Sequence, residues 1–121
     1  MDTGYKNFSN VNSHMEALPV EMEYQIAHSG VALADRSLSG RIGASGKDSL
    51  DLLHRLSTNE LSNLQCGTGT TTVLTSNKGR IIDWLVVENL NNQIIILTGI
   101  RNQKKIIDHI NFYTFGEDAS L

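Results

Sequence analysis

The chain has 121 residues, enough for one domain with a modest hydrophobic core and too few for two. Its formal net charge of −3 argues against a nucleic-acid-binding surface, because neutralising phosphates requires a clustered excess of Lys and Arg. No apolar run approaches the roughly 20 residues that span a bilayer, and the N-terminus shows neither a secretory signal nor a transit peptide. With a single cysteine, Cys66, the composition predicts a cytoplasmic protein that binds neither nucleic acid nor a membrane.

The N-terminal part divides at about residue 18. Residues 1–18 are rich in Asn and Ser and show no helical or strand period, so we expect a loosely ordered segment there and a single domain over residues 19–121. Pro19 and the glutamates that follow it predict a short helix, which Gly30 ends.

Two short strand-like segments come next, at 31–35 and 40–45, and they either pair as a hairpin or lie apart. Residues 45–48 read Ser-Gly-Lys-Asp, in which the serine is expected to cap a helix. The helix after this cap carries leucines at helical spacing, namely Leu50, Leu53 and Leu56. A second capping sequence at 57–60 predicts a further short turn.

The most informative stretch is a hairpin in the second half of the chain. Thr70–Thr75 and Ile81–Val87 are rich in β-branched residues, and the turn at 77–79 contains Asn, Lys and Gly. Both faces of the second strand are largely apolar, which predicts a central strand covered on two sides. Alternation assigns Ile81, Asp83, Leu85 and Val87 to one face, and Ile82, Trp84 and Val86 to the other.

A third buried strand is predicted at Ile94–Thr98 and an amphipathic helix at Asn102–Tyr113. Three strands joined by short polar turns make an antiparallel meander, on which the last helix packs. The predicted fold class is therefore α+β, an antiparallel β-meander with helices packed on it. The four histidines show no metal-ligand spacing and one cysteine cannot form a thiolate cluster, so no metal site is predicted.

Asp83 and Trp84 need an explanation beyond the fold. A carboxylate on an otherwise apolar face costs several kcal/mol if it lacks partners, so Asp83 either meets a structural donor or binds a ligand. The candidate donors are Arg41, Arg80 and the backbone N–H groups of a neighbouring turn. Trp84 is either part of the core or one wall of a pocket for a flat heterocycle.

The order of these motifs resembles a known family. The segments that carry the resemblance are Gly-Val-Ala-Leu-Ala-Asp-Arg-Ser at 30–37, Ser-Gly-Lys-Asp at 45–48, Leu-His-Arg-Leu-Ser-Thr-Asn-Glu-Leu at 53–61, and Asn-Lys-Gly-Arg-Ile-Ile-Asp at 77–83. Together they resemble the N-terminal folate-binding region of the aminomethyltransferase (glycine cleavage T-protein) superfamily, over roughly residues 20–121. Residues 78–83 look more like the folate-binding YgfZ-like branch than the transferases proper.

The resemblance implies tetrahydrofolate binding in a pocket lined partly by the sheet. In the transferases two aspartates follow the hairpin turn, and the second contacts the folate and supports methylene transfer. The first matches Asp83, whereas the second is Trp84, and an indole cannot accept a proton as a carboxylate does. Val86 and Thr98 fall at or near other pocket-lining positions. The resemblance thus implies cofactor-binding roles for Asp83, Trp84, Val86 and Thr98. It implies no catalytic residue, and it leaves open whether the chain is an enzyme.

Family members are much longer than 121 residues, and the Lys-Gly-Cys signature of the YgfZ-like branch is absent. The first hypothesis is therefore a truncated domain that binds tetrahydrofolate weakly or only with missing parts, without aminomethyl transfer. A second hypothesis is a non-enzymatic fragment without a ligand that forms a homodimer through an exposed sheet edge, beside an uncovered apolar face. The third is an aminomethyltransferase of the glycine cleavage system.

Overall fold

The computed structural model describes residues 18–121 and divides them into two units, with the boundary between Asp35 and Arg36. The first unit contains helix α1 (Val20–Ser29), which begins after Pro19 as the sequence predicts. None of the residues of α1 is buried. The prediction of a loosely ordered lead-in concerns residues that lie, except for residue 18, outside the described part of the chain.

The segment at 31–35 forms no strand, so that prediction is wrong. Its apolar side chains remain outside any core, and Leu33 is fully exposed. A strand needs a neighbour that satisfies its backbone hydrogen bonds, and a short apolar pattern does not supply one.

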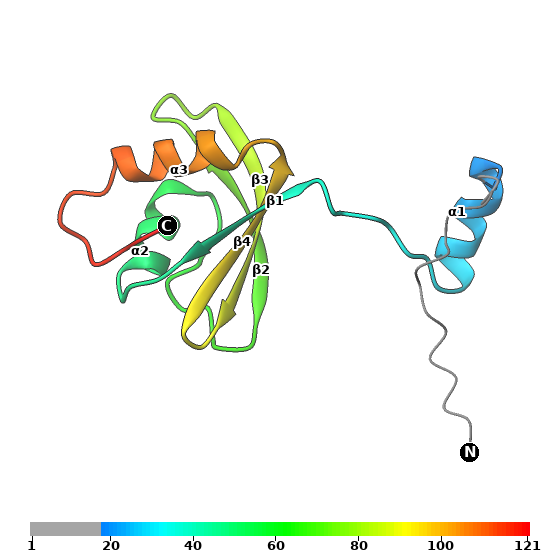
Figure 1. Cartoon of the computed structure of the whole chain (residues 1–121), viewed down its shortest axis with the longest axis horizontal. Helices are drawn as coiled ribbons and strands as arrows, with labels where there is room; N and C mark the ends of the chain where they lie inside the picture. Colours follow the sequence, from blue (N-terminus) through cyan, green and yellow to red (C-terminus); the bar gives the residue numbers. More distant parts are fainter. Residues whose placement is uncertain (1–17) are drawn as a thin grey trace, which may run out of the picture. The chain divides into compact units, whose positions relative to one another are not determined.

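The second unit is built on a four-stranded antiparallel sheet in the order β1-β4-β3-β2 (Figure 1). The turn between β2 and β3 contains Gly79 with a φ of 69°, a conformation that glycine adopts without strain. The predicted hairpin and meander are therefore confirmed. The strands are β1 (Ser39–Ala44), β2 (Gly69–Thr75), β3 (Ile81–Leu90) and β4 (Gln93–Ile100).

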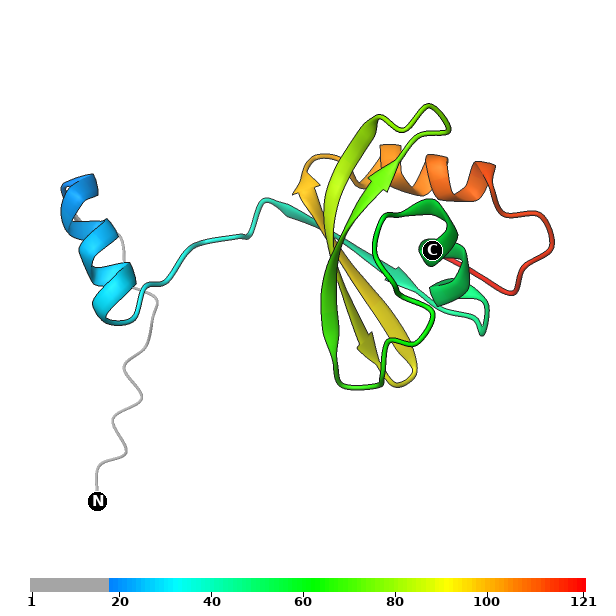
Figure 2. The same cartoon turned by 180° about the vertical axis from the view of Figure 1, so that it is seen from behind.

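Helices α2 (Ser49–Leu56) and α3 (Gln103–Phe112) both lie on one face of the sheet, as Figures 1 and 2 show. The hydrophobic core fills the space between these helices and the sheet, which confirms the α+β class. Fully buried core side chains include Leu52, Leu53, Leu74, Leu85, Val87, Ile96, Ile106 and Ile110. Within residues 18–121 no helix is both long and apolar enough to cross a membrane.

The N-cap of helix α2 lies three residues later than the expected serine cap. The N-cap position is taken by Asp48, and the backbone of Ser45 instead exchanges two hydrogen bonds with Ser120, at 2.9 and 2.8 Å. This bridge continues the line of β1, and the carbonyl oxygen of Ser45 also accepts the hydroxyl of Ser49, the first residue of α2, at 2.8 Å. A capping sequence cannot reveal a partner that lies 75 residues away along the chain.

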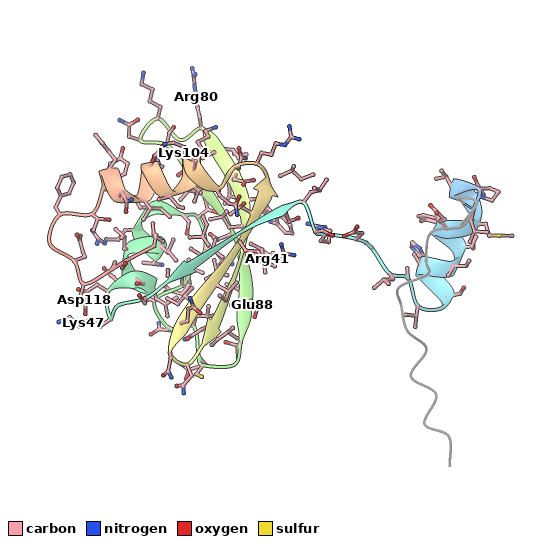
Figure 3. The ribbon with its side chains drawn as sticks, in the orientation of Figure 1. Arg41, Lys47, Arg80, Glu88, Lys104 and Asp118 are labelled. Carbon is pink, nitrogen blue, oxygen red and sulfur yellow. The ribbon has the colours of Figure 1, made fainter. Side chains whose placement is uncertain are left out.

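The other face of the sheet is open, so the expected cover on two sides is wrong for the described residues. Trp84 is 52% exposed on this face, and Arg41 and Glu88, labelled in Figure 3, belong to it as well.

The alternation along β3 holds for Leu85 and Val87, which are buried, but it fails near the turn. A register shift between β2 and β3 beside Thr75 leaves Ile81 73% exposed, while Ile82 packs against the core.

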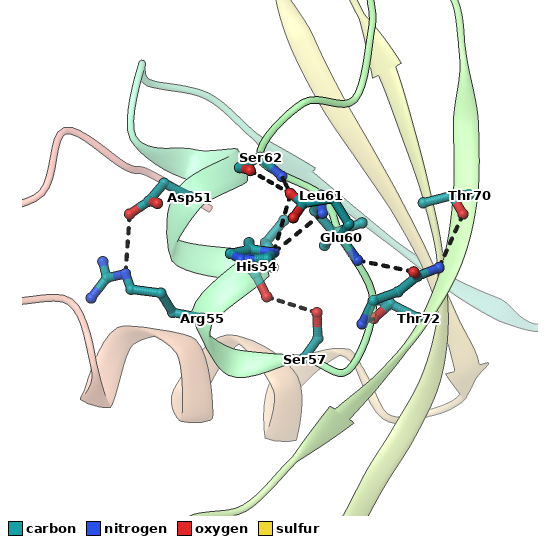
Figure 4. Close-up of polar contacts among 11 residues, drawn as sticks. Asp51, His54, Arg55, Ser57, Glu60, Leu61, Ser62, Thr70 and Thr72 are labelled. Carbon is teal, nitrogen blue, oxygen red and sulfur yellow. Dashed lines mark hydrogen bonds and ion pairs between the residues drawn. The ribbon is translucent and has the colours of Figure 1, made fainter.

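The outer edge of β2 is partly covered by residues 57–59 (Figure 4). The N–H of Thr58 donates to the carbonyl oxygen of Val73 at 3.1 Å, and the side-chain amide of Asn59 donates to the carbonyl oxygen of Thr71 at 2.8 Å. The short turn that follows is as predicted, and it buries Leu61 completely. Edge backbone groups that are paired in this way are protected from pairing with another chain.

An ion pair fixes the C-terminal segment to α2. Nη2 of Arg55 lies 2.8 Å from Oε1 of Glu117, and Nε of Arg55 lies 3.1 Å from Oδ2 of Asp51. The hydrogen bond from Arg55, helped by backbone N–H donors, lowers the pKa of Glu117 from its ordinary 4.5 to about 2. Because the folded state favours the charged carboxylate, this contribution to stability is complete above about pH 4.5 and disappears as the pH falls toward about 2.

We expect Glu117→Gln to remove this acid-sensitive contribution. The urea midpoint of the variant should therefore fall less than that of the wild type between about pH 5 and about pH 3. The control is Asp108→Asn, which breaks the exposed pair between Lys104 and Asp108 on α3 and should retain the wild-type pH dependence. If the urea midpoint of Glu117→Gln fell with pH as steeply as that of the wild type, the pair between Arg55 and Glu117 would not couple folding to pH.

Candidate functional site

A hollow of about 360 Å³ lies on the open face of the sheet. It is formed where β3 begins and β4 ends, together with the start of β1 and the residues just before it. All four residues that the resemblance implied as cofactor contacts border this one hollow. Its lining consists of Arg36, Ser39, Arg41, Asp83, Trp84, Val86, Leu97, Thr98 and Gly99.

One wall of the hollow is apolar. Val86 and Leu97 are direct partners across β3 and β4, so their side chains lie next to each other. Trp84 is two residues before Val86 on the same face and is half exposed, with Val73 of β2 opposite it. The interpretation of Trp84 as a core residue is therefore wrong. A half-exposed indole beside two aliphatic side chains offers a surface on which a flat ring can stack.

Asp83 forms the end of the hollow, and both of its carboxylate oxygens are engaged. Oδ2 accepts the backbone N–H of Gly99 at 2.8 Å, and Oδ1 accepts the N–H of Trp84 at 2.8 Å. Both donors are backbone N–H groups, as one of the sequence-based alternatives proposed, but they belong to strands β3 and β4 and not to a turn. The bond from Gly99 fastens the end of β4 to the start of β3, while the bond from Trp84 orients the carboxylate of Asp83 within β3.

Gly99 is fitted closely to that carboxylate. A Cβ atom at Gly99 would lie 3.0 Å from Oδ1 and 3.2 Å from Oδ2 of Asp83, which is closer than ordinary van der Waals contact. The absence of a side chain therefore allows the backbone N–H to reach Asp83. The resemblance singled out Thr98, whereas its neighbour Gly99 is the residue that donates to Asp83.

Thr98 borders the hollow, but the residue is only 4% exposed. Its hydroxyl donates to the carbonyl oxygen of Gly99 at 3.0 Å. The same hydroxyl would come within 2.1 Å of a Cβ atom at Gly40, so Thr98 packs over β1 where that strand has no side chain. A contact from this hydroxyl to a ligand remains a prediction.

Two arginines border the hollow on the side of β1. Nη1 of Arg41 donates to the carbonyl oxygens of Ser37 and Ser39, at 3.5 and 3.3 Å, and Nε of Arg36 lies 3.4 Å from the hydroxyl oxygen of Ser39. The hollow thus combines an apolar wall with positive charge on one side and a fixed carboxylate at its end. The sequence interpretation missed Arg36 and Ser39, because their position depends on the long-range pairing of β1 with β4.

A comparison with protein-family models identifies the family to which this chain belongs. The family model described as the GCVT N-terminal domain matches residues 5–119, which is nearly the whole chain. The chain belongs to the GCVT N-terminal domain family. The sequence-based resemblance to the glycine cleavage T-protein is therefore confirmed at the level of this domain.

Two relatives of this GCVT N-terminal domain extend the comparison. A curated aminomethyltransferase from Flavobacterium psychrophilum is 26% identical over 99 residues, which are 81% of this chain and 28% of the relative. The crystal structure of the glycine cleavage system aminomethyltransferase T from Bartonella henselae matches with a TM-score of 0.62 and 16% identity, over 69% of this chain and 24% of that one. This second likeness shows a shared fold. The chain thus spans about a quarter of the length of each relative.

Proposed function

We propose that this GCVT N-terminal domain binds tetrahydrofolate through its flat pterin ring in the hollow beside Trp84, and that it does not transfer an aminomethyl group. One observation carries the proposal: the four residues that the family resemblance implies as cofactor contacts border a single hollow. The family relationship supports the choice of ligand, because aminomethyltransferases depend on folate in general. The YgfZ-like branch is the analogy that we favour, since residues 78–83, Lys-Gly-Arg-Ile-Ile-Asp, resemble it more than they resemble the transferases.

The residues present suit a pterin. The volume of about 360 Å³ lies at the lower end of the range for small-molecule pockets, which is enough for a flat head group but leaves the rest of a folate outside. Trp84, Val86 and Leu97 would contact the ring, while Ser39 offers a hydroxyl for hydrogen bonding. With the remainder of the ligand in solvent, we expect weak binding, with a Kd on the order of 100 µM.

The chemistry of the hollow supports binding without transfer. Bound tetrahydrofolate supplies nitrogen atoms that can carry a one-carbon unit. Trp84, at the position of the transferase carboxylate, offers no proton acceptor. The neighbouring Asp83 has each oxygen occupied by a backbone N–H, and releasing it would break its bond to Gly99 at the end of β4. An aminomethyltransferase activity is therefore the less favoured proposal.

Trp84 is the only tryptophan, so it reports directly on the hollow. We expect its emission to be quenched as tetrahydrofolate is titrated to millimolar concentration, with a matching heat signal in calorimetry. p-Aminobenzoylglutamate, which lacks the pterin, should leave the emission nearly unchanged at the same concentration. An unchanged emission and a silent calorimeter with tetrahydrofolate would remove folate binding as a property of this chain.

A further inference from the structure

The open face of the sheet carries opposite charges near opposite corners. Arg41 lies on β1 at one outer edge of the sheet, in register with Leu97. Glu88 lies on β3, and its carboxylate would come within 2.4 Å of a Cβ atom at Gly69, so it extends over β2 toward the other edge. Both residues are labelled in Figure 3. A positive and a negative group thus stand diagonally across one surface.

Most of the face beside these two charges is apolar, although Asp83 and Arg36 border the hollow next to Trp84. The apolar region consists of Val73 on β2, Trp84 and Val86 on β3, and Ile95 and Leu97 on β4. Neither α2 nor α3 covers it, because both helices lie on the opposite face (Figures 1 and 2). A contiguous apolar patch with a charged rim is typical of a protein interaction surface.

From this pattern we propose that the face binds a second copy of the same chain, as a two-fold symmetric dimer. A two-fold interface uses the same patch on both subunits, so the patch must complement itself. Here the corner with Arg41 meets the corner with Glu88 of the partner subunit, and this pairing occurs twice. A partner with uniform charge would be attracted at one corner and repelled at the other, whereas a second copy matches both.

The diagonal arrangement also fixes the centre of the dimer. A symmetry axis that exchanges the two charged corners runs along the other diagonal, from near Trp84 to near Ile95. Residues on the axis meet their own counterparts, so Trp84 faces Trp84 of the partner subunit. Strands of the two copies then cross steeply, as in orthogonal sheet packing.

The size of the face predicts a weak dimer. Four strands about 4.8 Å apart, with roughly seven residues at about 3.3 Å each, give a face of about 19 by 23 Å. Two such faces bury on the order of 1,000 Å², which is the lower limit for a specific interface. We expect a dissociation constant on the order of 10–100 µM, and hence a dimer fraction that depends strongly on concentration.

Contacts within the chain favour the face over the sheet edges as the site of association. Residues 57–59 already occupy part of the edge of β2. On β1, Nε2 of Gln103 donates to the carbonyl oxygen of Arg41 at 3.3 Å, and Ser120 pairs with Ser45 just beyond the strand. This proposal does not depend on folate binding, although the second copy would cover the hollow and compete with a ligand.

Sedimentation velocity from about 5 to about 500 µM protein, in low salt and without folate, tests the dimer. The variants are Arg41→Glu, Glu88→Arg and the double variant Arg41→Glu/Glu88→Arg.

We expect each single charge reversal to weaken association at least tenfold, since it places like charges together. The double variant restores opposite charges and should associate within about threefold of the wild type. Lys105→Glu, on α3 away from this face, makes the same change in charge as Arg41→Glu and should have no effect.

A second measurement needs no variant. Association covers Trp84, so its emission maximum should shift to shorter wavelength as the wild-type concentration rises, and the shift should shrink in about 1 M salt. A monomer at every concentration, an emission maximum independent of concentration, or single reversals that associate like the wild type would each overturn the proposal. A folded double variant that remains as weak as the single variants would also overturn it.

Discussion

Replacing Asp83 with alanine is expected to lower the free energy of unfolding by about 2–3 kcal/mol. The substitution leaves the N–H groups of Gly99 and Trp84 without their acceptors, and each bond to a charged acceptor contributes about 1.5–3 kcal/mol. The expected loss of stability is smaller than the sum of the two bonds, because Asp83 and Trp84 lie partly in solvent and water replaces some of the lost hydrogen bonding. Urea denaturation of the purified chain measures the difference.

Two matched variants separate the role of the carboxylate from a general surface effect. Asp83→Asn keeps one oxygen acceptor and should lose less than half as much stability as Asp83→Ala. Asp108→Ala removes an exposed aspartate on α3 and should change the free energy of unfolding by less than about 0.5 kcal/mol. If Asp83→Ala were as stable as Asp108→Ala, the carboxylate would not fasten β4 to β3.

Replacing Trp84 with alanine is expected to weaken tetrahydrofolate binding by about tenfold to a hundredfold. Stacking of a flat heterocycle on an aromatic side chain is worth about 1–3 kcal/mol, and among residues 18–121 Trp84 is the one aromatic residue that lines the hollow. Because the indole is half exposed and outside the core, the same change should cost little stability. Calorimetry is the appropriate measurement, since the variant has no tryptophan emission.

The chain offers a close control for this prediction. Leu90 lies at the other end of β3 and is 53% exposed, nearly the same as Trp84, but it does not border the hollow. Leu90→Ala should therefore bind tetrahydrofolate like the wild type, and Trp84→Phe should keep part of the affinity. Equal affinity of Trp84→Ala and Leu90→Ala would exclude the indole as a contact.

Much of the fold could be predicted because its signals are local. The β-branched runs on either side of Asn77-Lys78-Gly79 give the hairpin, and the spacing of Ile106 and Ile110 gives α3. The errors occur where a distant partner decides the structure. Ser45 pairs with Ser120 instead of capping α2, and the register shift near Thr75 exchanges the positions of Ile81 and Ile82.

The candidate site could be predicted only in part, for the same reason. Asp83 and Trp84 stood out because a carboxylate and an indole are unusual in an apolar strand. The sequence also placed Arg41 among the possible partners of Asp83, yet its position in the hollow follows from the pairing of β1 with β4. No local pattern indicates that Arg36 and Ser39 approach Trp84, since they lie more than forty residues earlier in the chain.

The most direct measurement of folate binding in the hollow is an NMR titration of the ¹⁵N-labelled chain with tetrahydrofolate. We expect the largest amide shifts at Trp84, Val86, Leu97 and Gly99, together with the indole N–H of Trp84. The turn between β3 and β4, at the far end of the same strands, should remain unchanged. Shifts concentrated at that turn or on α2 and α3, or no shifts at millimolar ligand, would contradict binding in the hollow.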